Sequence, residues 1–264
     1  MHDRATERLI GNFYAGTAVR IKGEEQVGHW PEGAAPELDL HVDPIDGTEL
    51  FVAYVNALIA WTQLPEATRP PRPVCGAMVS AGALRPGSNA PEWGAIAAPF
   101  MFPKGLVRWA VSANAPAVRI EPNGTQHELP QASTLPAPEA GGVVLVASDS
   151  AERAFGGALR TAGYRVIKYK SAVAAALCAM DPGLFERLRP GELGNDPIVG
   201  VAMRSAKNWD VAATIALATN LGHFVSRTNG EPRTFEDGSR SALLAVSATI
   251  GRTLVKAIAP HLNK

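Results

Sequence analysis

The sequence predicts an α/β protein (α+β layered) in which an antiparallel N-terminal sheet is joined to a partly parallel C-terminal sheet. In the first half of the chain, short apolar segments are separated by turns rich in proline and glycine, a pattern typical of antiparallel strands. In the second half, apolar strands alternate with helical patterns, which indicates a substantially parallel sheet. The 264 residues are enough for one large domain or for two lobes with a cleft between them.

The N-terminal half begins with a helix and continues through strands. A helix is expected over residues 3–13, because Asp3 can open it and Leu9 and Ile10 recur at helical spacing. Strands are predicted at residues 17–22 and 37–42, and further apolar segments assigned to the sheet span residues 51–64, 74–80, 93–98 and 106–112. The proline-rich stretch 130–142 is the expected boundary between an N-terminal α+β lobe (residues 1–135), with most of the candidate ligands, and a C-terminal α/β lobe (residues 136–264).

The C-terminal half alternates between strands and helices. Strands are predicted at residues 143–147, 164–168, 197–203 and 243–246, and helices at residues 149–162, 172–180, 209–221 and 249–259. Ser148 and Asp149 stand at a strand-to-helix junction and are expected to cap the helix. Residues 182–196 are expected to form a long loop.

Composition excludes several classes of partner. The chain carries 25 basic and 25 acidic side chains, so neither a nucleic-acid backbone nor an anionic membrane surface is expected as a partner. Cys75 and Cys178 fit no metal-binding spacing and favour a reducing compartment. No apolar stretch approaches about 18 residues, and the N-terminus has no apolar signal core, which predicts a soluble, cytoplasmic protein.

The most informative segment is Asp43-Pro44-Ile45-Asp46-Gly47-Thr48, which follows a strand-like alternation of apolar residues. An Asp-Gly step alone is an ordinary turn former. Here it comes with a second carboxylate and a hydroxyl, at the point where a helical turn begins. Carboxylate oxygens suit Mg²⁺, and backbone N–H groups at a helix start can hold an anion. The segment therefore predicts a metal-assisted phosphate site.

Two further acids stand in similar settings. Glu24 follows a strand, and Asp210 lies at the head of a predicted helix. Alone, Glu24 would be a solvated loop charge and Asp210 an acid favoured by the helix dipole. Together with Asp43 and Asp46 they could converge on two divalent ions roughly 3.5–4 Å apart, an arrangement that stabilises the attacking and leaving oxygens of phosphoryl displacement.

Residues 43–48 resemble the signature of the inositol monophosphatase superfamily, the Mg²⁺-dependent, lithium-sensitive phosphatases that include fructose bisphosphatases and bisphosphate nucleotidases. Gly23-Glu24-Glu25 and Trp209-Asp210-Val211-Ala212-Ala213 are similar to the other two blocks of that family, in the same order, and residues 225–248 resemble its tail. The resemblance implies an inositol monophosphatase-like αβαβα sandwich, a phosphoric monoester hydrolase activity, two or three Mg²⁺ ions and a homodimer.

The resemblance also implies a role for each matching residue. Glu24, Asp43 and the carbonyl of Ile45 would hold one Mg²⁺, and Asp43, Asp46 and Asp210 would hold a second. Thr48 and Glu24 would orient and deprotonate the attacking water, while the N–H groups of Gly47 and Thr48 would bind phosphate oxygens. Asp3 falls where the family carries an acid of a weaker third metal site, although a helix N-cap is the commoner role for such a residue.

Other positions depart from the family. Met203 replaces the glutamate that bonds a ring hydroxyl in inositol-specific members, so a sugar phosphate or a nucleotide 3′-phosphate is favoured over myo-inositol phosphate. The basic residues Lys168, Lys170, Arg204 and Lys207 could receive a second anionic group, or could be solvated surface charges. The chain also begins at the third-metal acid, without the family's usual first helix, which puts third-metal binding in doubt.

Three functions follow from these observations. The leading hypothesis is a Mg²⁺-dependent phosphomonoesterase that hydrolyses a small phosphorylated metabolite. The alternative is a catalytically weak or silent relative that binds a phosphorylated ligand or a partner protein. Phosphoryl transfer to an acceptor ranks last, because no glycine-rich nucleotide loop is present. His29, His41 and His223 are interpreted as surface or packing residues, with His41 pointing outward from its strand.

Overall fold

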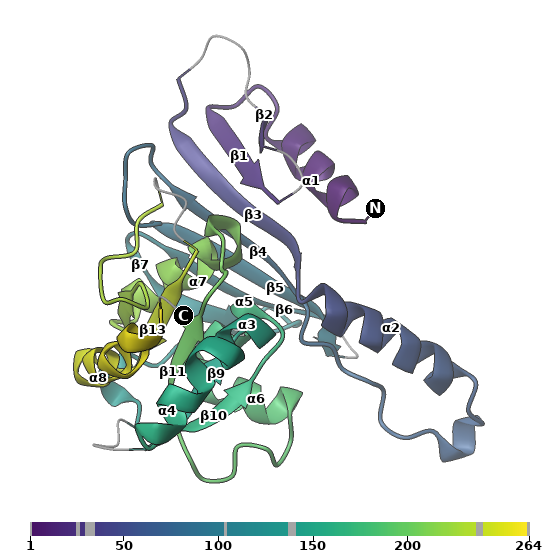
Figure 1. Ribbon diagram of the computed structural model, residues 1–264. Coiled ribbons are helices and arrows are strands. Elements are labelled where there is room, and N and C mark those ends of the chain that lie inside the picture. The colour runs from purple at the N-terminus through teal and green to yellow at the C-terminus, as the bar shows by residue number, and fades with distance from the viewer. Residues whose placement is uncertain are drawn as a thin grey trace.

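The computed structural model describes residues 2–24, 27–29, 35–102, 105–136, 141–235 and 240–262. Its helices and strands form five alternating layers, αβαβα, which confirms the predicted fold class (Figure 1). Helices α5 (Ala172–Met180) and α7 (Asn208–Asn220) lie between the two sheets and contribute many of the buried residues of the central core. None of the described helices combines the length and apolar character that a membrane span requires.

The first sheet has the strand order β2-β1-β3-β4-β5-β6-β7-β8. Neighbouring strands are antiparallel, as predicted, except that β1 and β3 run parallel. The strands are β1 (Val19–Gly23), β2 (Val27–His29), β3 (Leu38–Asp46), β4 (Met78–Leu84), β5 (Trp93–Phe102), β6 (Gly105–Ser112), β7 (Ala115–Ile120) and β8 (Gln126–Glu128).

The second sheet has the order β10-β9-β11-β13-β12 and is partly parallel, as predicted. Strand β9 runs parallel to β10 and to β11, whereas β13 is antiparallel to both of its neighbours. The strands are β9 (Val143–Val146), β10 (Arg165–Lys168), β11 (Ile198–Met203), β12 (Phe224–Ser226) and β13 (Ala242–Ala245). The division of the chain into two lobes stays a prediction.

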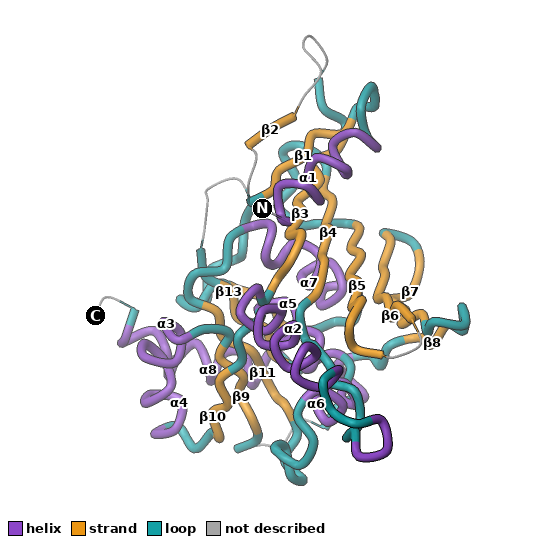
Figure 2. Tube along the Cα trace, turned by 90° about the vertical axis from the view of Figure 1, so that its right-hand side faces the viewer, coloured by secondary structure: helices purple, strands orange, loops and turns teal. Residues whose placement is uncertain are grey.

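The outer layers are helical. Helix α1 (His2–Phe13) packs on β3, on the face of the first sheet opposite α7. Helices α3 (Asp149–Ala151), α4 (Gly157–Thr161) and α8 (Ala248–Ile258) cover the far face of the second sheet, and a π-helical turn joins α3 to α4 (Figure 2). Helix α6 (Pro182–Leu188) follows α5, and short 3₁₀ turns lie at Glu66–Thr68, Ala132–Thr134 and Ala259–His261.

Two glycines bring α7 against the first sheet. Gly82 on β4 and Gly94 on β5 are cross-strand partners, and a Cβ on Gly82 would lie 2.4 Å from the backbone of Ala212 and Ala213. A Cβ on Gly94 would lie 2.7 Å from the carbonyl oxygen of Ala213. Because glycine lacks a Cβ, the helix can approach the strands this closely. The first turn of α7, with Asp210, is thereby held beside the end of β3.

The sequence assignment of residues 51–64 to the sheet is wrong. Helix α2 (Thr48–Thr62) occupies most of this segment and projects from the body of the molecule (Figure 1). Its apolar residues form a continuous run without the alternation of a half-buried strand, and the run starts at a left-handed Gly47, a conformation that can open a helix but not continue a strand. The predicted long loop at residues 182–196 is also wrong in its first half, where helix α6 begins at Pro182.

Candidate active site

A β-bulge at the end of β3 places Asp43 and Asp46 on the same face of the sheet. Asp43 pairs with Ser80 and Asp46 pairs with Met78, so three residues along β3 match two along β4. Residues three apart in a regular strand point to opposite faces, and one extra residue restores a common side. Pro44, which has no N–H to donate to a ladder, lies inside the bulge. Both carboxylates are buried, with Asp43 exposed by 4% and Asp46 by 8%.

The turn that follows prepares an anion-binding end of α2. The N–H of Ile45 donates to Oδ1 of Asp43 (3.1 Å), and the Ile45 carbonyl accepts a hydrogen bond from the Thr48 hydroxyl (3.3 Å). Gly47 has φ 83° and ψ 44°, a left-handed conformation that favours glycine, and is the N-cap of α2. The first N–H groups of a helix have no intrahelical acceptor and carry partial positive charge.

Asp46 is fixed by the N-terminus of α5. The Ser171 hydroxyl donates to Oδ2 of Asp46, and the backbone N–H groups of Ala172 and Val173 donate to the same carboxylate at 3.2 and 3.0 Å. Ser171 is also the N-cap of α5, accepting a hydrogen bond from the N–H of Ala174 at 2.9 Å. One carboxylate on the first sheet therefore holds a helix that begins 125 residues later in the chain.

Glu24 and Asp210 approach from two other elements. Asp210 lies in the first turn of α7, where its Oδ2 accepts a hydrogen bond from the N–H of Lys207 (2.7 Å). Glu24 is exposed at the end of β1 and pairs with Nζ of Lys207 at 3.3 Å. That ammonium also lies 4.9 Å from the centre of the Trp209 ring, within the range of a cation–π contact.

These groups line one pocket of about 210 Å³. Every metal or phosphate ligand predicted from the sequence whose side chain is described lies on its wall: Glu24, Asp43, Ile45, Asp46, Gly47, Thr48 and Asp210. Of the basic residues, Lys170 and Arg204 line the pocket, whereas Lys207 turns to Glu24. Met203 also lines it and, at 1% exposure, presents an apolar wall where an acid would offer an acceptor.

The carboxylates repel one another. Burial, followed by the charges of Asp46, Asp210 and Glu24, raises the pKa of Asp43 well above its ordinary value. Burial also raises the pKa of Asp210 to about 7, against the lowering effect of the hydrogen bond from Lys207. Burial raises the pKa of Asp46 as well, although the hydrogen bonds from α5 lower it. Buried acids that resist ionisation together favour a bound cation, whose charge would offset their repulsion.

The donor set fits Mg²⁺ in its chemistry. Carboxylates and a backbone carbonyl are hard oxygen ligands, and Asp43 and Asp210 are the buried members that gain most from a cation. Within the described ranges, no three acidic, histidine or cysteine side chains are already grouped closely enough to hold an ion.

Some site residues had little signal in the sequence. Ala147, Ser148, Ala172, Ser205 and Ala206 also line the pocket. Ser148 was predicted as a helix cap, and its hydroxyl does accept from the N–H of Ala151 at 3.0 Å. Ser171 was recognisable only as a serine before an apolar helix, because nothing in the sequence links it to Asp46.

Several sequence predictions concern residues away from this pocket. His41 does not point outward: it is 2% exposed and packs against Phe235, with ring centres 5.7 Å apart. His223 is buried, as a packing residue would be, and both cysteines are buried free thiols. Glu25 lies outside the described residues, as do the side chains of Asp3 and His29, so the third-metal role of Asp3 stays a prediction.

Comparison with solved structures assigns the fold. An inositol monophosphatase from Anabaena (Nostoc) superposes with a TM-score of 0.66 at 19% identity, over 98% of this chain and 86% of that one. Inositol monophosphatase II from Staphylococcus aureus gives 0.67 at 18% identity, over 99% and 85%. SuhB from Mycobacterium tuberculosis gives 0.62 at 18% identity, over 98% and 85%. No protein-family model and no curated protein matches the sequence. The chain has the inositol monophosphatase fold, as the resemblance implied.

Proposed function

We propose that this protein is a Mg²⁺-dependent phosphomonoesterase that hydrolyses a small phosphorylated metabolite. One observation carries the proposal: the bulge in β3 directs Asp43 and Asp46 into the same pocket as Glu24 and Asp210. That pocket lies at the N-terminus of α2, where backbone N–H groups favour an anion. Acids that repel one another beside an anion-binding helix end have little structural value without a cation.

Each residue has a role that its position supports. Glu24, Asp43, the carbonyl of Ile45, Asp46 and Asp210 would hold Mg²⁺, which would lower the pKa of the attacking water and neutralise charge on the phosphate. The N–H groups of Gly47 and Thr48 would bind phosphate oxygens. Thr48, with its hydroxyl already on the Ile45 carbonyl, would pass a proton toward Glu24, which is exposed and can rotate.

The pocket walls favour some substrates over others. Met203 offers no acceptor to a hydroxyl of an inositol ring, and inositol is the group named in the relatives with the same fold. Lys170 and Arg204 provide positive charge for an anion at the pocket edge. A sugar phosphate or a nucleotide 3′-phosphate is therefore favoured over myo-inositol phosphate. Two or three bound Mg²⁺ ions, a homodimeric state and a cytoplasmic location are further predictions.

The test is phosphate release from a panel of phosphorylated metabolites, with Mg²⁺ and with EDTA. Release that needs Mg²⁺ and falls by at least about 100-fold in Asp46→Asn supports the phosphatase, because it assigns the reaction to this carboxylate. Asp196→Asn is the matched control, since Asp196 is an exposed acid that does not line the pocket. Full activity in Asp46→Asn, or release unaffected by EDTA, contradicts the proposal.

A second function has one observation in its favour. Both oxygens of Asp46 are already engaged by α5, as they would be in a relative that binds a phosphorylated ligand or a partner without turnover. Calorimetric titration with the compounds of the panel separates the two functions. Binding that is tight, gives no product and is unchanged in Asp46→Asn would assign a binding role.

A further inference from the structure

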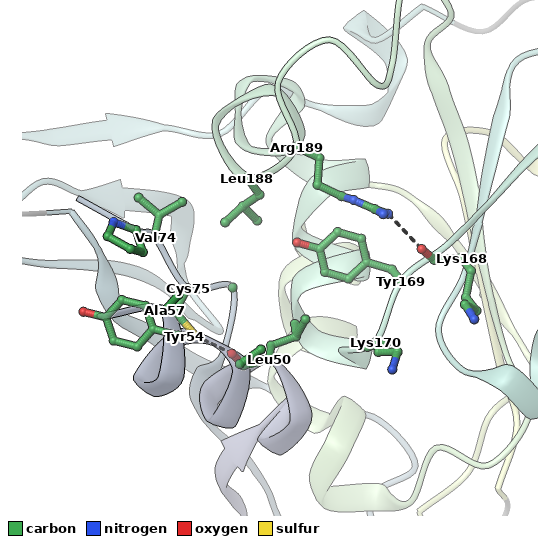
Figure 3. A pocket seen from close by; sticks show the side chains of 13 residues that line it. Leu50, Tyr54, Ala57, Val74, Cys75, Lys168, Tyr169, Lys170, Leu188 and Arg189 are labelled. Atoms are coloured by element: carbon green, nitrogen blue, oxygen red, sulfur yellow. Dashed lines mark hydrogen bonds between the residues drawn. The ribbon is translucent and has the colours of Figure 1, made fainter. Parts of the chain in front are cut away.

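A second and larger pocket lies beside the phosphate site. Its volume is about 410 Å³, within the range of small-molecule sites. It is formed by α2, by the segment 73–76 before β4, by the segment 168–170 after β10 and by the end of α6 (Figure 3). Its lining is mainly apolar: Leu50, Ala53, Tyr54, Ala57, Pro73, Val74, Cys75, Gly76, Tyr169 and Leu188. Of its lining residues, the sequence predictions assigned a substrate-binding role only to Lys168 and Lys170.

The charged residues on this pocket are all cations. Lys168, Lys170 and Arg189 line it, and among the described residues no acid does. Their acidic partners Asp149, Glu49 and Glu192 lie outside the lining, in pairs exposed enough to contribute little stability. An incoming group can therefore compete for Lys168 and Lys170 at small cost, whereas the Arg189 guanidinium also donates to the Lys168 carbonyl at 2.9 Å and lies 5.5 Å from the centre of the Tyr169 ring. Cations above an apolar cavity favour the face of an aromatic ring over an aliphatic group.

Tyr169 provides a polar group inside the pocket. Its side chain is 4% exposed, and Figure 3 shows its hydroxyl directed toward the side formed by Val74 and Cys75. Within the described part of the chain, no residue forms a hydrogen bond with this hydroxyl. Burial raises the pKa of Tyr169, so the hydroxyl keeps its proton and can donate to a ligand. A buried tyrosine hydroxyl ordinarily has a partner.

Two residues connect this pocket to the phosphate site. Lys170 lines both cavities. Leu50 separates them: its Cδ1 lies 3.3 Å from where a Cβ on Gly47 would stand and 3.7 Å from the equivalent position on Gly76. A ligand with its phosphate at the N-terminus of α2 would therefore pass Leu50 and Lys170 to place its remaining part in the larger pocket.

We propose that this pocket binds the ring of the substrate, and that the preferred substrates are phosphomonoesters whose alcohol carries an aromatic ring. The proposal rests on the proposed phosphatase function. The apolar lining buries the ring, the cations of the rim face it, and the Tyr169 hydroxyl donates to an acceptor on it. Of the two substrate classes favoured above, a nucleotide 3′-phosphate carries such a ring, whereas a sugar phosphate does not and would leave the pocket unfilled.

The proposal can be tested with a tryptophan that is introduced on α2 and fills the pocket. Ala57 and Ala60 are both exposed on this helix, but only Ala57 lines the pocket. Ala57→Trp therefore blocks the cavity, and Ala60→Trp places the same side chain on the same helix outside it. The measured quantity is the ratio of kcat/KM for 1-naphthyl phosphate to kcat/KM for glycerol 2-phosphate. We expect the ratio to fall about tenfold or more in Ala57→Trp and to stay at the wild-type value in Ala60→Trp.

Calorimetric titration of 1-naphthyl phosphate in EDTA makes the result independent of turnover. We expect the Kd to rise about tenfold in Ala57→Trp alone. If no phosphate ester is hydrolysed but this difference in Kd is found, the proposed phosphatase function is wrong, whereas the proposal that this pocket binds an aromatic ring is supported. If the wild type, Ala57→Trp and Ala60→Trp have equal kcat/KM ratios and equal Kd values, the proposal that this pocket binds an aromatic ring is wrong. A changed oligomeric state in Ala57→Trp, measured by gel filtration, also overturns it, because the pocket would then be a contact between copies.

Discussion

The carboxylate of Asp46 accepts a hydrogen bond from the hydroxyl of Ser171, and this contact joins the proposed metal site to the N-terminus of α5. Ser171 thereby performs two tasks, since its oxygen also accepts from the N–H of Ala174. The site and the central helical layer are consequently coupled. A change at either residue alters both the charge in the pocket and the start of a helix.

Ser171→Ala should cost about 3 kcal/mol of unfolding free energy, because it removes a helix cap and a hydrogen bond to a buried carboxylate. Ser247→Ala is the control: Ser247 caps α8, accepting from the N–H of Ile250, and no carboxylate among the described residues is hydrogen-bonded to it. We expect this variant to lose about 1 kcal/mol. Urea unfolding with both variants measures the difference. Equal losses would show that the contact with Asp46 contributes nothing.

Without metal, the protein should become less stable as pH rises. The folded state raises the pKa of Asp210 from 3.8 to about 7 and that of Asp43 in the same direction. Between the unfolded and folded values these groups hold protons that the unfolded chain has released, so the free energy of unfolding falls with increasing pH. Thermal unfolding in EDTA from about pH 5 to about pH 8 checks the sign.

Mg²⁺ should reverse this loss at the alkaline end, because it binds the ionised carboxylates of the folded state. Asp43→Asn should flatten the pH dependence in EDTA and abolish the gain with Mg²⁺, whereas Asp196→Asn should retain both. A Tm that is independent of Mg²⁺ at about pH 8 in the wild type would argue against a metal site here.

A different pair of residues should control stability in acid. Burial lowers the pKa of His223 to about 4, and that of His41 also to about 4. The unfolded chain binds protons to these groups below about pH 6.5, so their contribution to the free energy of unfolding should decrease as pH falls from there toward 4, opposing the contribution of Asp43 and Asp210 in the same range. His223→Leu should remove up to about 3 kcal/mol of this decrease. Comparing urea unfolding of both proteins at several pH values tests it; parallel curves would contradict it.

Gly82→Ala should displace α7 from the first sheet, because the new Cβ would lie 2.4 Å from the helix backbone. Overpacking of this kind costs about 1–3 kcal/mol, and activity should fall further, since Asp210 moves with the helix. Gly157→Ala is the control, as a Cβ there meets no atom within 4 Å. Urea unfolding and Mg²⁺-dependent phosphate release report the two effects. An active, stable Gly82→Ala protein would rule out close packing as the device that positions Asp210.

The sequence grouped residues that line one pocket, but it did not predict the path of the chain around that pocket. Residues 43–48 combine carboxylates, a glycine and a hydroxyl that have few other uses, so the pocket could be located from residue types alone. Helix α2 could not be predicted in this way. Its apolar side chains lie mostly on an exposed surface, where the sequence patterns of helices and strands are hard to separate. His41 was placed on the wrong face, because α7 covers the side of β3 that was taken to be solvent.

The other features that the sequence did not predict depend on contacts between residues far apart in the chain. The partnership of Asp46 with Ser171 depends on the meeting of two sheets, and no local pattern encodes it. The pocket proposed to bind the substrate ring is likewise formed by four segments that lie far apart in the sequence. Propensity and spacing describe neighbours along the chain, whereas these features arise from packing.

The extra residue in β3 makes the site tolerant of substitution at position 45 but dependent on the bulge. Any residue at position 45 leaves a carbonyl in place, so its side chain is free to vary. If β3 kept its length but paired with β4 without the bulge, one of the two carboxylates would point to the α1 side of the sheet. In proteins of this fold, a two-residue gap between these acids is therefore informative only together with the bulge that accommodates it.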